Sequence, residues 1–206
     1  MQLRIPLVLA SLAFATVAFA QNPISSDSPF QVRYAANLNV GDSVVNITNT
    51  GATATGATSS NLCVNVYAFS PDEQLVSCCS CVVTPNALVS LSAKNDLISN
   101  TLTPAVPTSI VVKLVATAGG SCNAATAGSG TSALATGLAA WGTTLHANTS
   151  AAAGTYAVTE TAFTPATLSA AELGRITALC GFIQSNGSGF GICRSCRLGG
   201  LGASAQ

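Results

Sequence analysis

The sequence predicts a mainly β protein, an antiparallel β-sandwich of Ig-like or similar type with one C-terminal α-helix and disulfide crosslinks. Three observations lead to this prediction. Short Val-rich runs follow one another between turn residues, as in all-β proteins. A single segment near the C-terminus repeats its apolar residues at helical spacing. Eight cysteines, an even number, follow an N-terminal stretch typical of an export signal.

The first twenty residues have the three parts of a secretion signal. Arg4 provides the positive charge, residues 5–17 are apolar, and Ala18-Phe19-Ala20 is a small-x-small cleavage site. A stable membrane anchor needs about 20 apolar residues, and polar residues follow directly after Ala20. We therefore expect a cleaved signal peptide over 1–20, and a mature chain that is secreted or periplasmic and has no transmembrane segment.

Eight strand-like runs account for most of the mature chain. They are bounded by turn residues such as Gly41-Asp42, Pro71-Asp72 and Pro85-Asn86. The run 110–115 is apolar on both faces apart from Lys113, which predicts a central strand. The expected strands are QVRYAANLNV (31–40), SVVNIT (43–48), NLCVNVYAF (61–69), LVSCCSCVV (75–83), ALVSLS (87–92), SIVVKLVAT (109–117), LATGLAAWGTTLHA (134–147) and TYAVTETAF (155–163).

We expect one β-rich domain over residues 21–200 and a disordered tail over 201–206. The low-complexity stretch at 119–133 leaves open a subdivision of this domain. The stretch 51–60 (GATATGATSS) has a similar composition and is expected to be a loop.

The expected helix begins at a capping box formed by Ser169 and Glu172. Its apolar residues, Leu173, Ile176, Leu179 and Ile183, share one helical face, and Asn186-Gly187 provides a stop. A second capping-box pattern, Ser70 to Glu73 with Pro71 at the first helical position, predicts a short helical turn after the third strand.

The cysteines are candidates for disulfides: Cys63, Cys78, Cys79, Cys81, Cys122, Cys180, Cys193 and Cys196. A hairpin centred on Asp72 would place Cys63 opposite Cys81, and a two-residue shift would select Cys79 instead. Cys180 would pair with Cys193 or Cys196, and no partner follows for Cys122. A bond between the adjacent Cys78 and Cys79 is disfavoured because it would distort the peptide. A zinc site is disfavoured because the spacing of 78, 79 and 81 lacks the usual separation.

Charged residues make up only 7% of the chain, against about 25% in ordinary globular domains. The net charge is zero and no basic stripe exists, so the composition argues against nucleic-acid binding. A surface of Ser, Thr, Asn and Gly is typical of a protein that contacts its own copies, a cell surface, a matrix or glycans. Trp141 and Tyr156 are candidate stacking residues for a glycan.

No motif assigns a catalytic residue, a metal ligand or a cofactor. Glu73, Glu172, Asp42, Asp72 and Asp96 occupy caps and turns, Asp27 lies in the lead-in, and Glu160 is expected in solvent. His146 is the single histidine, and no nucleophile elbow accompanies it. Cys193-Arg194-Ser195-Cys196 is a candidate redox dithiol, although such motifs usually open a helix and this one follows a helix.

The run Asn61–Cys81, NLCVNVYAFSPDEQLVSCCSC, resembles one found in uncharacterised secreted bacterial proteins. This resemblance implies secretion and provides no functional residue. The triplets beginning at Asn46, Asn148 and Asn186 are glycan acceptors if the host has the machinery. The leading hypothesis is a secreted, non-enzymatic structural or surface-contact protein, and the alternatives are thiol–disulfide exchange and glycan binding.

Overall fold

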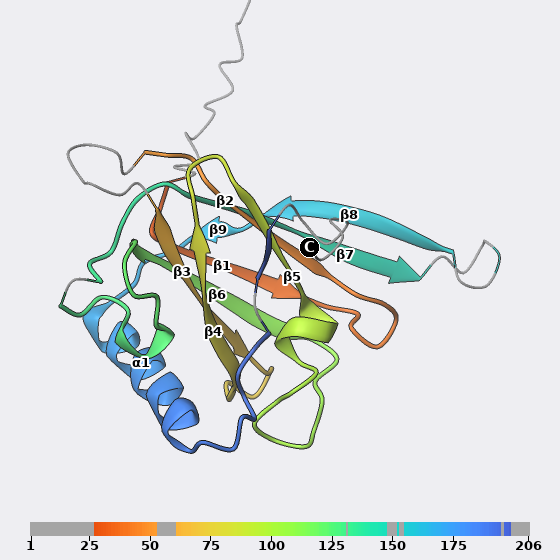
Figure 1. Ribbon diagram of the computed structural model, residues 1–206. Coiled ribbons are helices and arrows are strands. Elements are labelled where there is room, and N and C mark those ends of the chain that lie inside the picture. Colours follow the sequence, from red (N-terminus) through yellow and green to blue (C-terminus); the bar gives the residue numbers. More distant parts are fainter. Residues whose placement is uncertain are drawn as a thin grey trace, which may run out of the picture.

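The protein is a sandwich of two five-stranded antiparallel sheets with one long helix against it (Figure 1). The computed structural model describes residues 27–52, 61–130, 132–147, 152, 155–194 and 196–198. The expected signal peptide, most of the low-complexity loop and the expected tail lie outside these residues. The prediction of a mainly β sandwich with one C-terminal helix is confirmed.

The first sheet, sheet A, has the order β4-β3-β6-β1-β9. The central place of β6 confirms the prediction made from its apolar composition. The strands are β1 (Phe30–Ala35), β3 (Leu62–Phe69), β4 (Leu75–Val83), β6 (Ile110–Ala118) and β9 (Thr164–Pro165).

The second sheet, sheet B, has the order β10-β5-β2-β7-β8. Residues on both sides of the 119–133 stretch contribute strands to each sheet. The strands are β2 (Val44–Asn49), β5 (Leu88–Ser92), β7 (Leu138–Ala147), β8 (Tyr156–Ala162) and β10 (Arg197–Leu198).

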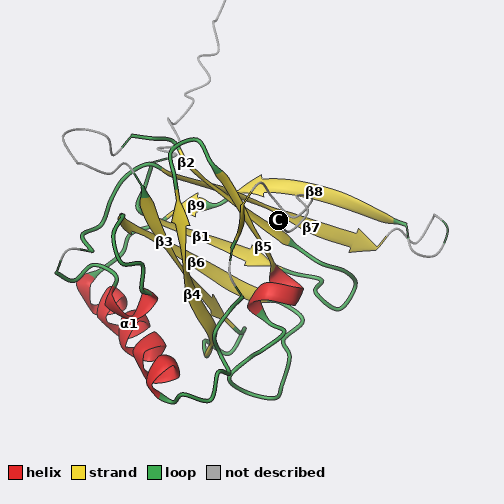
Figure 2. Ribbon diagram, in the orientation of Figure 1, coloured by secondary structure: helices red, strands yellow, loops and turns green. Residues whose placement is uncertain are grey.

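Two apolar clusters hold the layers together. The cluster between the sheets takes alternate residues of facing strands, for example Val64 and Val66 of β3 with Val45 and Ile47 of β2. The second cluster lies on the outer face of sheet A, where α1 (Ala170–Ser185) covers it (Figure 2). No helix among the described residues has both the length and the apolarity needed to cross a bilayer.

Both ends of α1 follow the sequence prediction. Ser169 Oγ accepts a hydrogen bond from Glu172 N at 3.1 Å, and Gly187 has the left-handed φ of 66° that ends a helix. The Glu172 carboxylate contacts the Lys113 ammonium on β6. The half of the capping box that uses the Ser169 side chain is therefore present. The Glu172 side chain, which would form the other half, instead contacts Lys113 and holds the helix on the sheet.

The capping box predicted at Ser70–Glu73 is wrong. These residues form the β3–β4 hairpin turn, in which Glu73 N donates to Ser70 O and Ser70 N donates to Gln74 O, both at 2.9 Å. Glu73 has φ 64°, a left-handed value that closes a three-residue hairpin loop. The flanking strands pair with each other, and this pairing overrides the local helical signal.

Two expected strands are shorter than predicted. The first ends at Ala35, because Asn37 has φ 60° and its carbonyl accepts from Val40 N and Gly41 N in a turn. The seventh begins at Leu138, after Gly137 with φ 103°. The turn predicted at Asp96 is present as the π-helical turn η1 (Ala93–Leu97), whereas the 3-10 turn η2 (Ala124–Thr126) was not predicted.

All eight cysteines lie in four disulfides, which confirms the prediction of a crosslinked fold. The predicted pairings are wrong. Cys63 bonds Cys122, for which the sequence suggested no partner, at a Cα–Cα distance of 5.2 Å. The other three bonds start on β4 and are Cys78–Cys180, Cys79–Cys193 and Cys81–Cys196.

A bulge explains the error in the hairpin. Near the turn Phe69 pairs with Leu75, as a hairpin centred on Asp72 requires, but the register shifts between Ala68 and Phe69. Beyond this bulge Cys63 faces Val82. One extra residue moves every later side chain to the other face, and Cys63 is therefore on the opposite face from Cys79 and Cys81.

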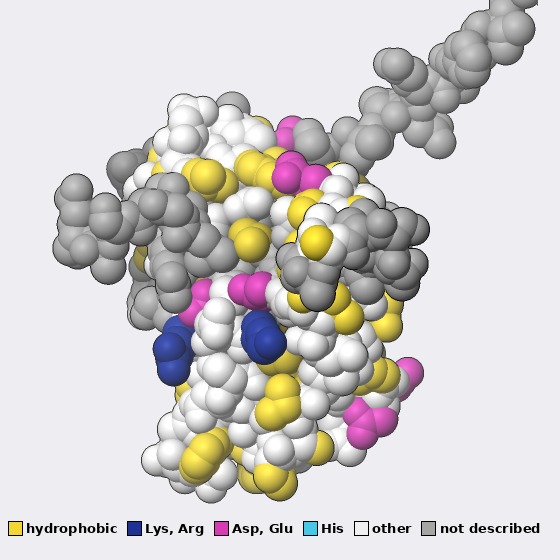
Figure 3. Space-filling view, turned by 90° about the vertical axis from the view of Figure 1, so that its right-hand side faces the viewer, with side chains coloured by type: hydrophobic (Ala, Val, Ile, Leu, Met, Phe, Trp, Pro, Cys, Tyr) yellow, Lys and Arg dark blue, Asp and Glu magenta, His cyan; other side chains and the backbone are white. Residues whose placement is uncertain are grey.

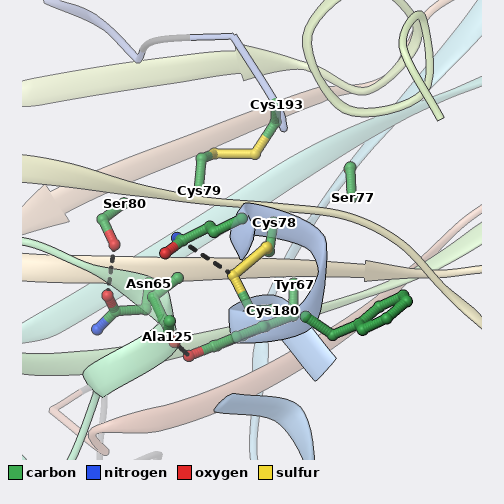
Figure 4. Close-up of a disulfide and its surroundings, with 12 residues drawn as sticks. Asn65, Tyr67, Ser77, Cys78, Cys79, Ser80, Ala125, Cys180 and Cys193 are labelled. Carbon is green, nitrogen blue, oxygen red and sulfur yellow. Dashed lines mark hydrogen bonds between the residues drawn. A yellow bond between two sulfur atoms is a disulfide. The ribbon is translucent and has the colours of Figure 1, made fainter. Parts of the chain in front are cut away.

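Consecutive cysteines of β4 crosslink opposite sides of sheet A (Figure 4). Cys78 points to the outer face and bonds Cys180 of α1, with Cα atoms 6.0 Å apart. Cys79 points to the inner face and bonds Cys193, with Cα atoms 5.4 Å apart. The alternation of side chains along a strand makes one short stretch an anchor for two segments.

The segment 191–198, here called the strap, joins the two sheets. It runs beside β4, where Cys78 N donates to Gly191 O and Cys193 N donates to Cys78 O. It then bonds β4 again through Cys196 and pairs with β5 as strand β10. The strap therefore pairs with the edge strand β4 at Cys78 and is bonded to it through Cys79 and Cys81.

Candidate interaction surface

The free edge of β8 is the candidate functional site. Each sheet has two edge strands, which carry unpaired backbone groups unless something covers them. The strap lies beside β4 and is bonded to it at Cys78, Cys79 and Cys81, while β9 and β10 have two residues each and β9 ends in Pro165. Strand β8 has seven residues, all of them exposed, and no described residue pairs with its outer side. Of the two long edge strands among the described residues, β8 is the one with no described partner anywhere along its outer side.

The register shows which backbone groups point outward. Phe163 N donates to Ala140 O at 2.9 Å, one position beyond the pair Ala162 and Trp141. Hydrogen-bonded and non-hydrogen-bonded pairs alternate along an antiparallel ladder. Even-numbered residues of β8 therefore direct their N–H and C=O groups away from β7; these are Tyr156, Val158, Glu160 and Ala162.

A second hydrogen bond supports the same assignment of outward-facing and inward-facing backbone groups. Thr50 N donates to Gly137 O at 2.8 Å in the β2–β7 register, so odd-numbered residues of β7 face β2. Even-numbered residues of β7 must then face β8. This agrees with the bond that Ala140 accepts from Phe163.

Arg33 of β1 anchors the β7–β8 hairpin to sheet A. Arg33 is buried, with 7% of the residue exposed to solvent. It donates to Thr144 Oγ1 of β7 at 2.8 Å and to Thr161 Oγ1 of β8 at 3.2 Å. It also lies against Gly142, where an added Cβ would stand 2.7 Å from Nη1. These contacts fix both strands of the hairpin before any partner arrives.

Burial lowers the pKa of the Arg33 guanidinium below its usual range, because desolvation disfavours the charged form. The described residues supply hydroxyl acceptors to it, including Ser43 Oγ at 3.4 Å, and none of the ion pairs among them involves it. Arg33 was not among the residues predicted from the sequence. A lone Arg in an expected strand, with Thr-rich strands elsewhere, was the available signal.

The two faces of the hairpin differ. One face of the hairpin carries the side chains of Trp141 and Tyr156, which lie at opposite ends of it, and those of Val158 and Glu160. Trp141 is half-buried and Tyr156 is 42% exposed. Their shared face is compatible with stacking on a glycan, and glycan binding stays a prediction. Glu160 is exposed, as its position in an alternating strand predicted.

The other face carries hydroxyl and imidazole groups. His146 Nε2 lies 2.9 Å from Thr159 Oγ1 across the β7–β8 pair, and His146 is exposed. No cysteine lies near it in the register. The contact joins the two strands of the hairpin near the tip.

The candidate dithiol is divided between two crosslinks. Cys193 bonds Cys79 and Cys196 bonds Cys81, so the two sulfur atoms of the C-x-x-C motif are not joined to each other. Cys193 is buried. Thiol–disulfide exchange at these positions stays a prediction, and the geometry gives it no added support.

Several acidic side chains hold turns in place. Asp42 accepts from Ser92 Oγ at 2.5 Å and from Lys94 N at 2.9 Å, and buried Asp96 accepts from Ser92 N at 2.6 Å. Both carboxylates therefore fix η1. Within the described residues, no group of three or more His, Cys, Asp or Glu side chains is placed to hold a metal ion.

A cleft of about 540 Å³ lies between α1, the β3–β4 turn and the outer face of sheet A. It holds four of the chain's few charged groups: Glu73, Lys113, Glu172 and Arg175. Lys113 Nζ contacts Glu172 and lies 4.6 Å from the centroid of the Phe69 ring, and Arg175 Nη1 lies 3.7 Å from Glu172 Oε2. Of these contacts, the one between Lys113 of β6 and Glu172 of α1 attaches the helix to the sheet.

Comparisons of the chain with protein-family models, with curated proteins and with solved structures found no match. The resemblance of Asn61–Cys81 to uncharacterised secreted bacterial proteins stays a prediction.

Proposed function

We propose that the protein is a secreted, non-enzymatic structural protein that makes its contacts by strand addition at the free edge of β8. The observation that carries the proposal is a seven-residue edge strand, exposed throughout, on a hairpin that Arg33 holds in place. An extended strand is the partner that satisfies a row of outward N–H and C=O groups. The proposed function is therefore the binding of an extended strand through the backbone hydrogen bonds of β8.

The crosslinks support a place outside the cytoplasm. Four disulfides among eight cysteines are typical of oxidising compartments. The sequence prediction of a signal peptide over residues 1–20 agrees with export. Together they support a secreted or periplasmic protein that keeps its shape through covalent bonds.

The surface suits contact along a backbone. Figure 3 shows a face made mostly of backbone and uncharged polar side chains, with scattered hydrophobic side chains and a few basic and acidic ones. Most natural edge strands are blocked by Lys, Pro or a covering segment. Strand β8 contains no Lys and no Pro, and Glu160 is its one charge. The edge is therefore open to a strand of either charge.

A labelled peptide with the sequence of residues 155–163, TYAVTETAF, tests the proposal. We expect saturable binding to the intact protein, measured by fluorescence anisotropy. Val158→Pro removes one outward N–H while leaving the bonds to β7, because Pro is tolerated on the solvent side of an edge. It should weaken binding at least about tenfold, the effect of losing one hydrogen bond and the fit around it.

Val158→Thr is the matched control, because it removes the same apolar side chain and keeps the N–H. It should bind the peptide as the unchanged protein does. The thermal midpoints of both variants show that the fold is retained. Equal binding by Val158→Pro and the unchanged protein, or no binding by either, would rule out strand addition at this edge.

A further inference from the structure

The edge of β8 is complementary to itself. Two antiparallel copies of one strand can pair about a two-fold axis, so that the same residues serve both partners. The outward groups belong to Tyr156, Val158, Glu160 and Ala162, which are all even-numbered. Hydrogen-bonded pairs across such an axis must therefore join even-numbered residues to even-numbered residues.

Three registers satisfy this rule over most of the strand, and they differ in two respects. If Val158 faces its own copy, or if Glu160 does, the pairing covers five of the seven residues. If Thr159 lies on the axis, all seven residues of Tyr156–Ala162 pair. The second difference is the carboxylate of Glu160, which would stand directly opposite its own copy in the register centred on Glu160. Like charges in that position are destabilising.

We infer that the occupant of the β8 edge is β8 of a second copy of this chain, with Thr159 on the two-fold axis. This inference rests on the proposed function. In this register Val158 faces Glu160 and Tyr156 faces Ala162, so that apolar side chains stand beside the single carboxylate. About eight backbone hydrogen bonds would join the copies. The two copies of sheet B become one continuous sheet.

The charge and the anchoring of the edge favour a second copy. Without Arg4 of the expected signal peptide the chain has six basic and seven acidic residues, so two copies meet with almost no net repulsion. The Thr159 side chain shares its face with Thr161, whose hydroxyl is bonded to Arg33. The backbone of each edge is therefore fixed in the extended form that the other copy requires, and little ordering is needed on association.

A cysteine on the axis tests the register. Thr159 and its copy would form a non-hydrogen-bonded pair with Cα atoms about 4.5 Å apart, within the range that a disulfide spans. We expect Thr159→Cys, secreted and oxidised as the full chain, to form a reducible dimer on non-reducing gels. Glu160→Cys is the matched control. Its partner is Val158 of the other copy, so it should stay monomeric on the same gels.

A second measurement keeps the test independent of thiol side reactions. Sedimentation of the unchanged protein should give a concentration-dependent dimer, and Val158→Pro should weaken it at least tenfold. A dimer that crosslinks through Glu160→Cys and not through Thr159→Cys would overturn the register. A protein that stays monomeric at all concentrations and yet binds the TYAVTETAF peptide would overturn the second copy as occupant and leave the proposed function standing. A protein that neither dimerises nor binds the peptide would overturn both this inference and the proposed function.

Discussion

Tyr67 shows how one buried hydroxyl makes the fold sensitive to alkali. It lies fully buried on β3 beneath α1, and its hydroxyl donates to Ala124 O at 2.6 Å. Burial raises the pKa of Tyr67 far above its ordinary value, because the phenolate would be desolvated. The folded state keeps this proton while the unfolded chain loses it near pH 10. Tyr67 therefore stabilises the fold fully below about pH 10, and this contribution is lost as the pH rises further.

We predict that Tyr67→Phe flattens the fall of unfolding free energy between about pH 9 and 12. At neutral pH the same change should lower stability by about 1 kcal/mol, the value of one hydrogen bond. Urea unfolding at a series of pH values measures both. Tyr34→Phe is the control, since Tyr34 is 58% exposed and its loss should leave the alkaline decline unchanged. An equally steep decline in Tyr67→Phe would contradict the argument.

Two glycines with similar surroundings should change the stability in opposite directions when each is replaced by alanine. Gly174 lies inside α1 and Gly187 just after it, and an added Cβ would meet nothing within 4 Å at either. Gly187 has φ 66°, which disfavours any residue with a Cβ, while Gly174 is helical. Gly174→Ala should raise stability by about 0.5–1 kcal/mol, and Gly187→Ala should lower it by about 1 kcal/mol. Thermal midpoints decide, and equal shifts would contradict the prediction.

At the scale of elements, most strands and the helix could be predicted from the sequence. Val-rich runs and turn residues locate β2 to β6 within one or two residues, and Ser169 and Gly187 locate the ends of α1. The register of the β3–β4 hairpin could not be predicted. It depends on a bulge beside Phe69, and no local signal distinguishes a bulged hairpin from a regular one. Every predicted pairing of Cys63 failed for that reason.

The candidate site depended on information that a single strand does not carry. Strand β8 reads as an ordinary alternating strand, and its place at an edge follows from the order of all five strands in sheet B. The role of Arg33 also depends on which strand of the other sheet faces it, because Thr144 and Thr161 lie more than a hundred residues away in the sequence. Long-range packing decides both.

At the scale of the whole molecule, the strap disulfides should act as a pair. Cys79–Cys193 and Cys81–Cys196 have sequence separations of 114 and 115 residues, but Cys78–Cys180 already closes most of that loop. Either strap bond alone therefore confines the same remaining segment, which runs from Cys180 to the strap. We predict that replacing both cysteines of one bond by Ala lowers stability by about 2 kcal/mol, since the other bond still confines the chain. Replacing all four should lower it by more than the sum of the two single losses. Urea unfolding of the three variants measures this, and additive losses would contradict it.

The placement of the thiols also dictates the order in which the fold can be completed. Cys78, Cys79 and Cys81 reach an oxidising compartment long before Cys180, Cys193 and Cys196 if the chain enters N-terminus first. During that interval these three neighbouring thiols lie between Cys63 and Cys122, which are each other's native partners. We therefore expect early oxidation to produce mispaired bonds that must later be exchanged. We expect correct pairing to need a thiol isomerase, or oxidation slow enough for Cys196 to emerge before the bonds form.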